Sequence, residues 1–300
     1  MRFSLNLVTV AIPFYNPGAV FIHSINSVLL QTYTNLEVLL VNDGSTDGSL
    51  ELAQTIQDPR VKVINDNKNK GLNYRLNQII DIANGEYIAR MDADDLMALD
   101  RVEKQLDFLL GNPDLDLVTT GLCSIDSNFN VLGFRGAEIK GVDNELNFES
   151  LVFGSKCPIH ASLLAKKSWC KRNYYSDKYQ RIEDYNLWLT AYTKGDLKIG
   201  FLDEYLYYYE ESNSINPTNL SLAYKNQFKL VVNEFYDDVK LLVFVRFLLK
   251  TCIKRFLIKF SVVQNALLAR RHKHVEDKGL AMNVERVNKH INSILHINEN

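Results

Sequence analysis

The chain lacks the sequence patterns that mark the commonest cofactor and metal sites. Its 300 residues contain no G-x-G-x-x-G and no G-x-x-x-x-G-K-[ST], which argues against a dinucleotide enzyme and a P-loop ATPase. The six histidines form no H-E-x-x-H or comparable metal spacing. The four cysteines show no C-x-x-C spacing, so we expect reduced, mostly buried thiols in a cytosolic protein.

Strong charge and long apolar runs are also missing. The formal net charge of -2 argues against a general nucleic-acid-binding protein. No uncharged run approaches the roughly 20 residues that a membrane span requires. The apolar run at residues 5–12 leads directly into Pro13 and Asn16 without a small-residue cleavage site, which predicts a buried strand instead of a signal peptide. Hydrophobic residues make up 46% of the chain, enough for a globular core in one large domain or two ordinary ones.

Apolar runs alternate with amphipathic segments through the first hundred residues. Strands are predicted at residues 7–12, 36–41, 61–64 and 87–91. The helices predicted between them make βαβ units, and hence an α/β fold with a mostly parallel central sheet flanked by helices. Ligands bind beyond the carboxyl ends of such strands. The polar residues at these ends are Asn16, Asp43, Asn67, Asp92 and Asp94. Four loops should therefore converge on one crevice that takes a phosphate-bearing ligand.

The segment G-E-Y-I-A-R-M-D-A-D-D-L, residues 85–96, ends a predicted strand in three carboxylates. Asp92, Asp94 and Asp95 repel one another and suit neither a strand nor a buried core. A hard cation such as Mg²⁺ or Mn²⁺, with phosphate among its ligands, would offset this repulsion. The alternative is that Asp94 or Asp95 caps a helix predicted at residues 96–110.

Three other residues of this half have both structural and binding interpretations. Asp47 suits turn shaping and helix capping better than ligand contact. Asp43 stands directly at a strand end, where contact with a ligand is favoured. Arg90 lies inside a buried strand and needs a partner, which is either a structural carboxylate or a diphosphate.

Five stretches resemble family 2 glycosyltransferases of the GT-A fold, in that family's order and spacing. They are V-A-I-P-F-Y-N, S-V-L-L-Q-T-Y, E-V-L-L-V-N-D-G-S-T-D-G-S, N-K-G-L-N-Y-R-L-N and G-E-Y-I-A-R-M-D-A-D-D. The resemblance covers residues 5–215 and implies a GT-A nucleotide-sugar-binding fold. We expect a catalytic domain at residues 1–217, with a nucleotide-binding half at 1–115 and an acceptor half at 116–217.

The resemblance also implies roles for residues of the predicted crevice. The loop after the first strand and Asp43 would hold the nucleotide base and ribose. The D-x-D motif would meet the ribose and the metal-bound diphosphate, with Asp94 as the direct ligand of Mn²⁺ or Mg²⁺ and Asp92 as an alternative. The predicted nucleotide-binding residues are Pro13, Tyr15, Asn16, Asp43, Asn67, Arg90, Asp92 and Ala93.

A second acidic pair opens the amphipathic helix predicted from the stretch R-I-E-D-Y-N-L-W-L, residues 181–189. The helix dipole favours acids in a first turn, which is a purely structural explanation. In the functional alternative, one carboxylate takes the proton from an acceptor hydroxyl. The stretch matches the family's E-D-Y-x-L-W-L motif, whose second acid is the base, so the resemblance favours Asp184 over Glu183.

Two further residues are metal-site candidates by resemblance. His160 lies in a strand predicted at residues 158–164, where family members often have a histidine near the site, although a lone histidine is usually structural. Glu211 follows a tyrosine-rich strand, where many relatives have a histidine that contacts the metal or diphosphate. A glutamate could ligate a metal but would repel phosphate, so this position departs from the pattern.

Residues 218–300 predict a helical, basic C-terminal region. Between residues 240 and 275 there are nine Lys or Arg and no Asp or Glu, interleaved with apolar residues. One interpretation is a helix, or a pair, lying on an anionic membrane surface. The other is a helical appendage packed on the catalytic domain. At about 100° per residue, Arg246 and Lys250 share one side of a helix and Arg255 falls largely opposite, so a single amphipathic helix is not clean.

The resemblance, taken together with the basic C-terminal region, implies an inverting glycosyltransferase on the inner face of the bacterial cytoplasmic membrane. It would move a sugar from a UDP-sugar to a glycan or lipid-linked acceptor in surface polysaccharide or lipopolysaccharide biosynthesis. A sugar nucleotidyltransferase usually begins with a glycine-rich basic loop, which is absent after Ile12. A non-catalytic nucleotide-sugar-binding scaffold would lack the Glu183–Asp184 pair. No nucleic-acid partner is expected.

Overall fold

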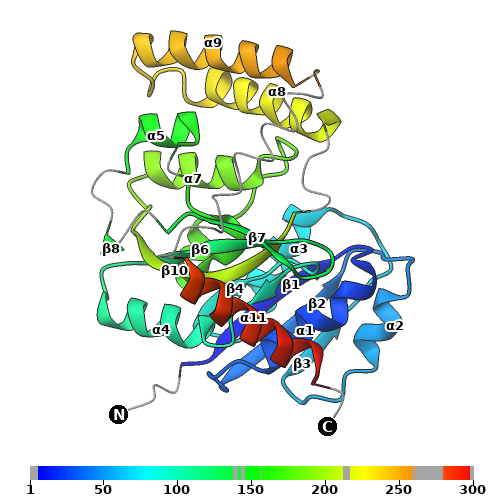
Figure 1. The fold of residues 1–300 in the computed structure, drawn as a ribbon. Helices are drawn as coiled ribbons and strands as arrows, with labels where there is room; N and C mark the ends of the chain where they lie inside the picture. The colour runs from blue at the N-terminus through cyan, green and yellow to red at the C-terminus, as the bar shows by residue number, and fades with distance from the viewer. Residues whose placement is uncertain are drawn as a thin grey trace.

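A computed structural model describes residues 6–137, 141–142, 146–155, 157–211, 217–258, 260 and 280–297. These residues form a ten-stranded sheet with helices on both faces, which confirms the predicted α/β class (Figure 1). The sheet is parallel along β3-β2-β1-β4 and mixed along β4-β9-β6-β10-β5. Its first half therefore matches the parallel sheet predicted from the alternation of strands and helices.

The first half follows the predicted pattern closely. Its strands are β1 (Val8–Phe14), β2 (Leu36–Asn42), β3 (Val61–Ile64) and β4 (Tyr87–Arg90). Its helices are η1 (Gly18–Val20), α1 (Phe21–Leu29), α2 (Ser49–Gln54) and α3 (Leu72–Ile82). Every residue of β1, β2 and β4 is buried. These strands are covered on both faces, which is why they are continuous apolar runs.

The segment after the three carboxylates differs from the predicted helix. Leu96–Met97 form a short strand, β5, which pairs antiparallel with β10. The helix α4 spans Arg101–Gly111 and its N-cap residue is Asp100, so the prediction that Asp94 or Asp95 caps this helix is wrong. Leu96 and Met97 are fully buried. Packing of their side chains in the sheet outweighs the helical periodicity of the segment.

The second half combines two long strands and three short ones with four helical segments. Its strands are β6 (Leu117–Ile125), β7 (Val131–Arg135), β8 (Gly141–Val142), β9 (Leu164–Lys166) and β10 (Ile199–Glu210). Its helices are α5 (Phe148–Phe153), η2 (His160–Ser162), α6 (Lys167–Arg172) and α7 (Glu183–Thr193). His160 thus begins a 3-10 turn, and the strand predicted at residues 158–164 is wrong. The turn is fixed by Ser162, whose Oγ accepts from the Thr120 N–H at 3.0 Å and donates to the Ile159 carbonyl at 3.0 Å.

The helices of the C-terminal third lie in two separate parts of the molecule. Helices α8 (Pro217–Glu234) and α9 (Leu241–Leu257) contact each other above α5 and α7 (Figure 1). Helix α11 (Ala281–Leu295) packs against α1 and β7 near the opposite end of the molecule. No helix in the described ranges is both long enough and apolar enough to span a bilayer. The basic segment is described only to residue 260, with a gap at 259, so residues 261–275 of the prediction lie outside the described part.

Two apolar layers enclose the sheet. Helices α1 and α4 cover one face through side chains such as Ile25 and Leu106. Helices α3, α6 and α7 cover the other face, where the rings of Trp169 and Trp188 stack at 6.3 Å between centroids. Each such fully buried large side chain contributes about 1.5–3 kcal/mol. These layers fix the strand ends, and with them the loops that carry the polar residues.

Candidate active site

The carboxyl ends of β1, β2 and β4 meet at one edge of the sheet, as predicted. The parallel register aligns Phe14 with Asn42 and Ala11 with Arg90, so the three following loops are neighbours. Two cavities open among these loops, and Pro13 and Tyr15 line both.

The smaller hollow, here called the D-x-D cavity, has a volume of about 350 Å³. The residues that line it include Pro13, Tyr15, Asn16, Asp92, Ala93, Asp94 and Glu210. The larger hollow, here called the Asp43 cavity, has a volume of about 770 Å³. The residues that line it include Pro13, Tyr15, Asp43, Lys70, Gly71, Arg181 and Glu183. The structure therefore gathers most of the predicted site residues around one shared wall.

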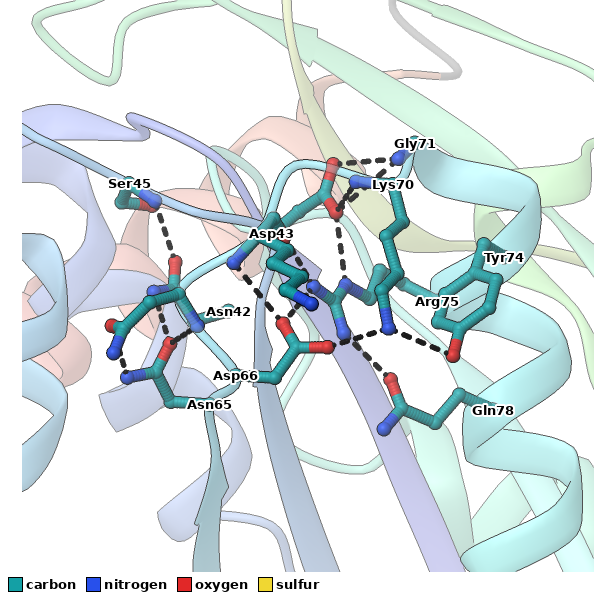
Figure 2. Close-up of polar contacts among 12 residues, drawn as sticks. Asn42, Asp43, Ser45, Asn65, Asp66, Lys70, Gly71, Tyr74, Arg75 and Gln78 are labelled. Atoms are coloured by element: carbon teal, nitrogen blue, oxygen red, sulfur yellow. Dashed lines mark hydrogen bonds and ion pairs between the residues drawn. The ribbon is translucent and has the colours of Figure 1, made fainter.

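Asp43 is bound by the protein itself (Figure 2). Its carboxylate accepts from the backbone N–H groups of Lys70, at 2.8 Å, and Gly71, at 3.0 Å, and from Nε of Arg75, at 2.9 Å. Gly71 has φ +88°, a conformation that L side chains rarely adopt, and it presents its N–H to Asp43 at the start of α3. Asp43 therefore fixes the position of the loop that enters α3.

Arg75 is fully buried and holds this network together (Figure 2). Besides Asp43, its guanidinium donates to Asp66 Oδ1 at 2.6 Å, to Gln78 Oε1 at 2.9 Å and to the Lys68 carbonyl. A buried cation needs partners of this kind because its desolvation costs several kcal/mol. Arg75 belongs to the stretch N-K-G-L-N-Y-R-L-N, but no role was predicted for it from the sequence. Arg75 lies four residues, about one helical turn, after Gly71, and this spacing is the sequence feature that could have indicated its role.

Arg90 pairs with a carboxylate of its own strand end. Its two terminal nitrogens donate to the two oxygens of Asp92 at 2.6 and 3.0 Å, a bidentate contact. Of the two partners predicted for Arg90, the structure shows the structural carboxylate. The pair also holds the Asp92 carboxylate in one orientation at the edge of the D-x-D cavity.

Asp95 and Tyr207 fix the carboxylate loop to β10, a role that the sequence did not predict for either residue. The Tyr207 hydroxyl donates to Asp95 Oδ2 at 2.7 Å and accepts from the Asp92 N–H at 3.0 Å. Asp95 Oδ1 accepts from the Glu210 N–H at 2.8 Å. Burial, followed by the charges of Asp92 and Asp94, raises the pKa of Asp95 well above its usual value. Asp95 therefore holds the carboxylate loop against β10 and does not line the D-x-D cavity.

Asp94 is the exposed acid of the loop. Desolvation by the surrounding protein, and then the charge of Asp92, raises its pKa to about 6. No Lys, Arg or His within the described ranges forms an ion pair with Asp94. The charge of Asp94 is thus disfavoured by the protein alone and would be favoured by an added cation.

The Glu183–Asp184 pair opens α7 at the rim of the Asp43 cavity. Glu183 lines this cavity, whereas Asp184 lines neither cavity and accepts from the Tyr185 N–H at 2.7 Å. Burial raises the pKa of both carboxyls, and the charges of Arg90 and Asp92 act on both. Both acids are therefore within electrostatic reach of the D-x-D loop.

Besides Arg90 and Asp184, three predicted site residues lie outside both cavities. His160 is buried, and its Nε2 is 2.7 Å from the Tyr175 hydroxyl. Asn67 accepts from the Asn65 side chain at 2.8 Å and shapes the turn after β3. Glu211 is buried and forms an ion pair with Arg135. Metal or nucleotide roles for these three remain predictions without a supporting contact.

The donor chemistry of the D-x-D cavity fits a hard divalent cation. In the described part of the chain, no group of three or more His, Cys, Asp or Glu is arranged to hold a metal by itself. The carboxylates of Asp92, Asp94 and Glu210 nevertheless line one cavity. Mg²⁺ and Mn²⁺ are typically held by one or two carboxylates together with substrate phosphate and water.

A family model described as "Glycosyl transferase family 2" matches residues 9–170, more than half of the chain. The chain belongs to glycosyltransferase family 2. EpsE of Bacillus subtilis is 34% identical over 195 residues, which are 63% of this chain and 67% of EpsE. Chondroitin synthase of Escherichia coli is 30% identical over 238 residues, which are 76% of this chain and 32% of the synthase.

Two solved structures share the fold of this glycosyltransferase. S. aureus TarS in complex with UDP-GlcNAc superposes with a TM-score of 0.61 at 18% identity, covering 80% of this chain and 71% of TarS. The mannosyltransferase PcManGT of Pyrobaculum calidifontis, in complex with GDP-Man and Mn²⁺, gives a TM-score of 0.57 at 18% identity. That match covers 96% of this chain and 86% of PcManGT. These likenesses confirm the predicted GT-A fold.

Proposed function

We propose that this glycosyltransferase moves a sugar from a nucleotide-sugar, with a UDP-sugar as the first candidate, to an acceptor hydroxyl with inversion. The observation that supports the proposal is the shared wall of the two cavities. One cavity carries Asp92 and Asp94, and the other carries Asp43 and Glu183. TarS, which has the same fold, is complexed with UDP-GlcNAc. PcManGT is complexed with GDP-Man, so GDP-sugars are the alternative donor class.

The Asp43 cavity would bind the base and ribose of the donor. Tyr15 is 55% exposed at the shared wall, and an exposed aromatic ring there can stack on a nucleotide base. Asp43 holds the Lys70 and Gly71 backbone in place, so the start of α3 faces the cavity in one conformation. This preorganisation lowers the ordering cost of binding the donor.

Asp94 would hold Mn²⁺ or Mg²⁺ in the D-x-D cavity, with Asp92 positioned by Arg90. When bound, the cation supplies Lewis-acid stabilisation of the departing diphosphate. Asn16, at the same wall, has φ +50° and its side chain accepts from the Thr46 N–H at 2.7 Å. Asn16 thereby fixes the loop after β1 against the loop after β2.

Asp184 would act as the base, with Glu183 as the alternative. The acceptor oxygen forms a bond to the anomeric carbon while the bond from that carbon to the diphosphate oxygen breaks. The hydroxyl proton passes to the carboxylate, and the nucleoside diphosphate leaves. Burial raises the pKa of Asp184, which makes its carboxylate a stronger base than a solvated aspartate.

The acceptor is proposed to be a glycan or a lipid-linked sugar of surface polysaccharide biosynthesis. A relative named chondroitin synthase supports a polysaccharide product. A lipid-linked acceptor would place the enzyme at the inner face of the cytoplasmic membrane, as the sequence predicts for the basic residues 240–275.

The deciding experiment is calorimetric titration with UDP, GDP, CDP and dTDP, with and without Mn²⁺. We expect tight binding of UDP only with the metal, and loss of that binding in Asp94→Ala. Preference for GDP would change the donor class and keep the enzyme. Absence of binding by folded protein would favour a non-catalytic scaffold, and pyrophosphate exchange in a product assay would favour a nucleotidyltransferase.

A further inference from the structure

Helix α9 exposes a continuous apolar surface. The α9 stripe consists of Leu241, Leu242, Val245, Leu249, Ile253 and Phe256, whose exposed fractions range from 43% to 73%. Isolated exposed apolar side chains are ordinary, but a contiguous patch usually marks an interaction surface. Phe260, 49% exposed just beyond the helix, extends the same surface.

The stripe occupies one sector of the helix. At 100° per residue, its six side chains fall within about 120° of arc. The opposite side buries Phe247 and Thr251 against the protein. Arg246 lies just past one edge of the stripe and Arg255 past the other, and both are exposed. Arg246 and Arg255, which fall on largely opposite sides of the helix, therefore border the two edges of the outward apolar stripe.

The helix is held to the protein by its other faces. Lys250 Nζ lies 4.9 Å from the centre of the Phe153 ring and donates to the Phe153 carbonyl at 3.4 Å. Lys254 Nζ lies 5.1 Å from the centre of the Tyr224 ring on α8. These contacts fix the rotation of α9 and leave the stripe outward. In Figure 1, α9 forms the outermost layer, beyond α8, α5 and α7.

Charge distinguishes the candidate partners of the stripe. Residues 240–258 contain five Lys or Arg and no Asp or Glu. A second copy packed on the stripe would bring two such basic helices together, and like charges placed opposite one another are unfavourable. An anionic bilayer offers apolar contact for the stripe and negative headgroups for Arg246 and Arg255.

We propose that the α9 stripe docks this enzyme on the surface of an anionic lipid bilayer, with its apolar side chains at the acyl boundary. Figure 1 places α9 on the side of α7, whose first turn carries the proposed base pair. The acceptor half would therefore lie between the bilayer and the nucleotide half. The inference rests on the proposed function for its lipid-linked acceptor, but its test does not depend on that acceptor.

The test is flotation of the full chain with phosphatidylcholine vesicles and with vesicles one third phosphatidylglycerol. We expect binding only to the anionic vesicles, weakened by salt. Leu249→Asp with Ile253→Asp should weaken binding more than tenfold. Arg246→Gln and Arg255→Gln should each weaken it about fivefold at low salt. The matched control is Met282→Asp, because Met282 is 81% exposed on α11, away from the stripe, and it should bind like the wild type.

Cys252 lies within the arc of the stripe and is exposed, so a fluorophore on it reports contact with acyl chains. A blue shift with anionic vesicles supports the proposal. Failure of folded protein to bind them, or equal binding by the Leu249→Asp, Ile253→Asp variant, overturns it. A dimer that dissociates in that variant would also overturn it, by assigning the stripe to a second copy. Calorimetry with UDP, run in parallel, separates this failure from a failure of the proposed function.

Discussion

Asp43 and Asp94, which follow the two strands on either side of β1, are in opposite electrostatic environments. Asp43 receives two backbone N–H groups and the buried Arg75 guanidinium, all from its own chain. Asp94 forms no ion pair with a described basic residue, and its pKa is raised to about 6. Arg90, the nearest buried cation of that loop, is paired with Asp92. The first carboxylate is compensated by the fold, whereas the second depends on a charge supplied from outside.

This difference separates residues that shape the site from residues that do its chemistry. A carboxylate compensated within the protein mainly fixes backbone, as Asp43 does for the entrance to α3. A raised pKa means that the protein destabilises the ionised form of a carboxylate. When that carboxylate lies on a cavity wall, a bound cation would stabilise its ionised form. Removal of each should therefore have a different consequence, one for stability and one for activity.

The largest expected effect is on turnover in Asp94→Asn. We expect a loss of about 10³-fold, as several kcal/mol of charge stabilisation disappear. The unfolding free energy should not fall, because a charge repelled by Asp92 is removed. Turnover assays and urea titrations check both parts, with Asp114→Asn at an exposed position as the control. Full turnover in a folded Asp94→Asn enzyme would contradict the role given to this acid.

The next effect is on stability, in Arg75→Met. Removing this fully buried cation breaks its ion pairs with Asp43 and Asp66 and should cost about 3–5 kcal/mol of unfolding free energy. A double-mutant cycle with Asp43→Asn should show strong coupling, since the two side chains are in direct contact at 2.9 Å. Additive effects in the cycle would mean that Arg75 acts through its other partners.

Local sequence patterns were enough to predict much of this arrangement. The strand ends after β1, β2 and β4 follow from apolar runs that stop at turn residues, and parallel pairing brings them together. The start of α7 at Glu183 was predicted from the same kind of local pattern. The carboxylate loop, in contrast, is fixed by Tyr207, 112 residues from Asp95 in the chain. Side-chain periodicity carries no information about a contact at that separation.

The packing of α11 likewise depends on contacts between residues that are far apart in the sequence. Arg286 donates to Asp100 at 2.6 Å and to Glu204 at 2.8 Å, and His290 Nδ1 lies 2.8 Å from the Tyr208 hydroxyl. Val287 and Ile291 are buried beside β10. The sequence predicted a helical C-terminal region but not the position of its last helix, because amphipathicity indicates which face of a helix is buried and not what that face packs against. The boundary proposed at residue 217 remains a prediction.

The third expected effect is the pH dependence of metal binding. Asp94 must lose its proton to ligate a cation, and its pKa of about 6 lies above the usual value for an aspartate. Mn²⁺-dependent UDP binding should therefore weaken roughly tenfold per pH unit below the pKa and level off above it. Calorimetry across this range checks the slope. Equal affinity well below and well above the pKa would show that Asp94 is not the titrating ligand.

The smallest expected effect is on stability, in a glycine substitution within the loop that follows β2 and begins at Asp43. Gly48, which ends the loop after β2 at the start of α2, has φ +86° and ψ 0°. A Cβ there would meet no atom within 4 Å, so Gly48→Ala strains only the backbone and should cost about 1 kcal/mol. Gly111→Ala is the matched control, since its Cβ is equally free of contacts and its φ is not positive; it should be neutral or slightly stabilising. Equal urea midpoints for the two variants would mean that the left-handed turn does not hold this loop in place.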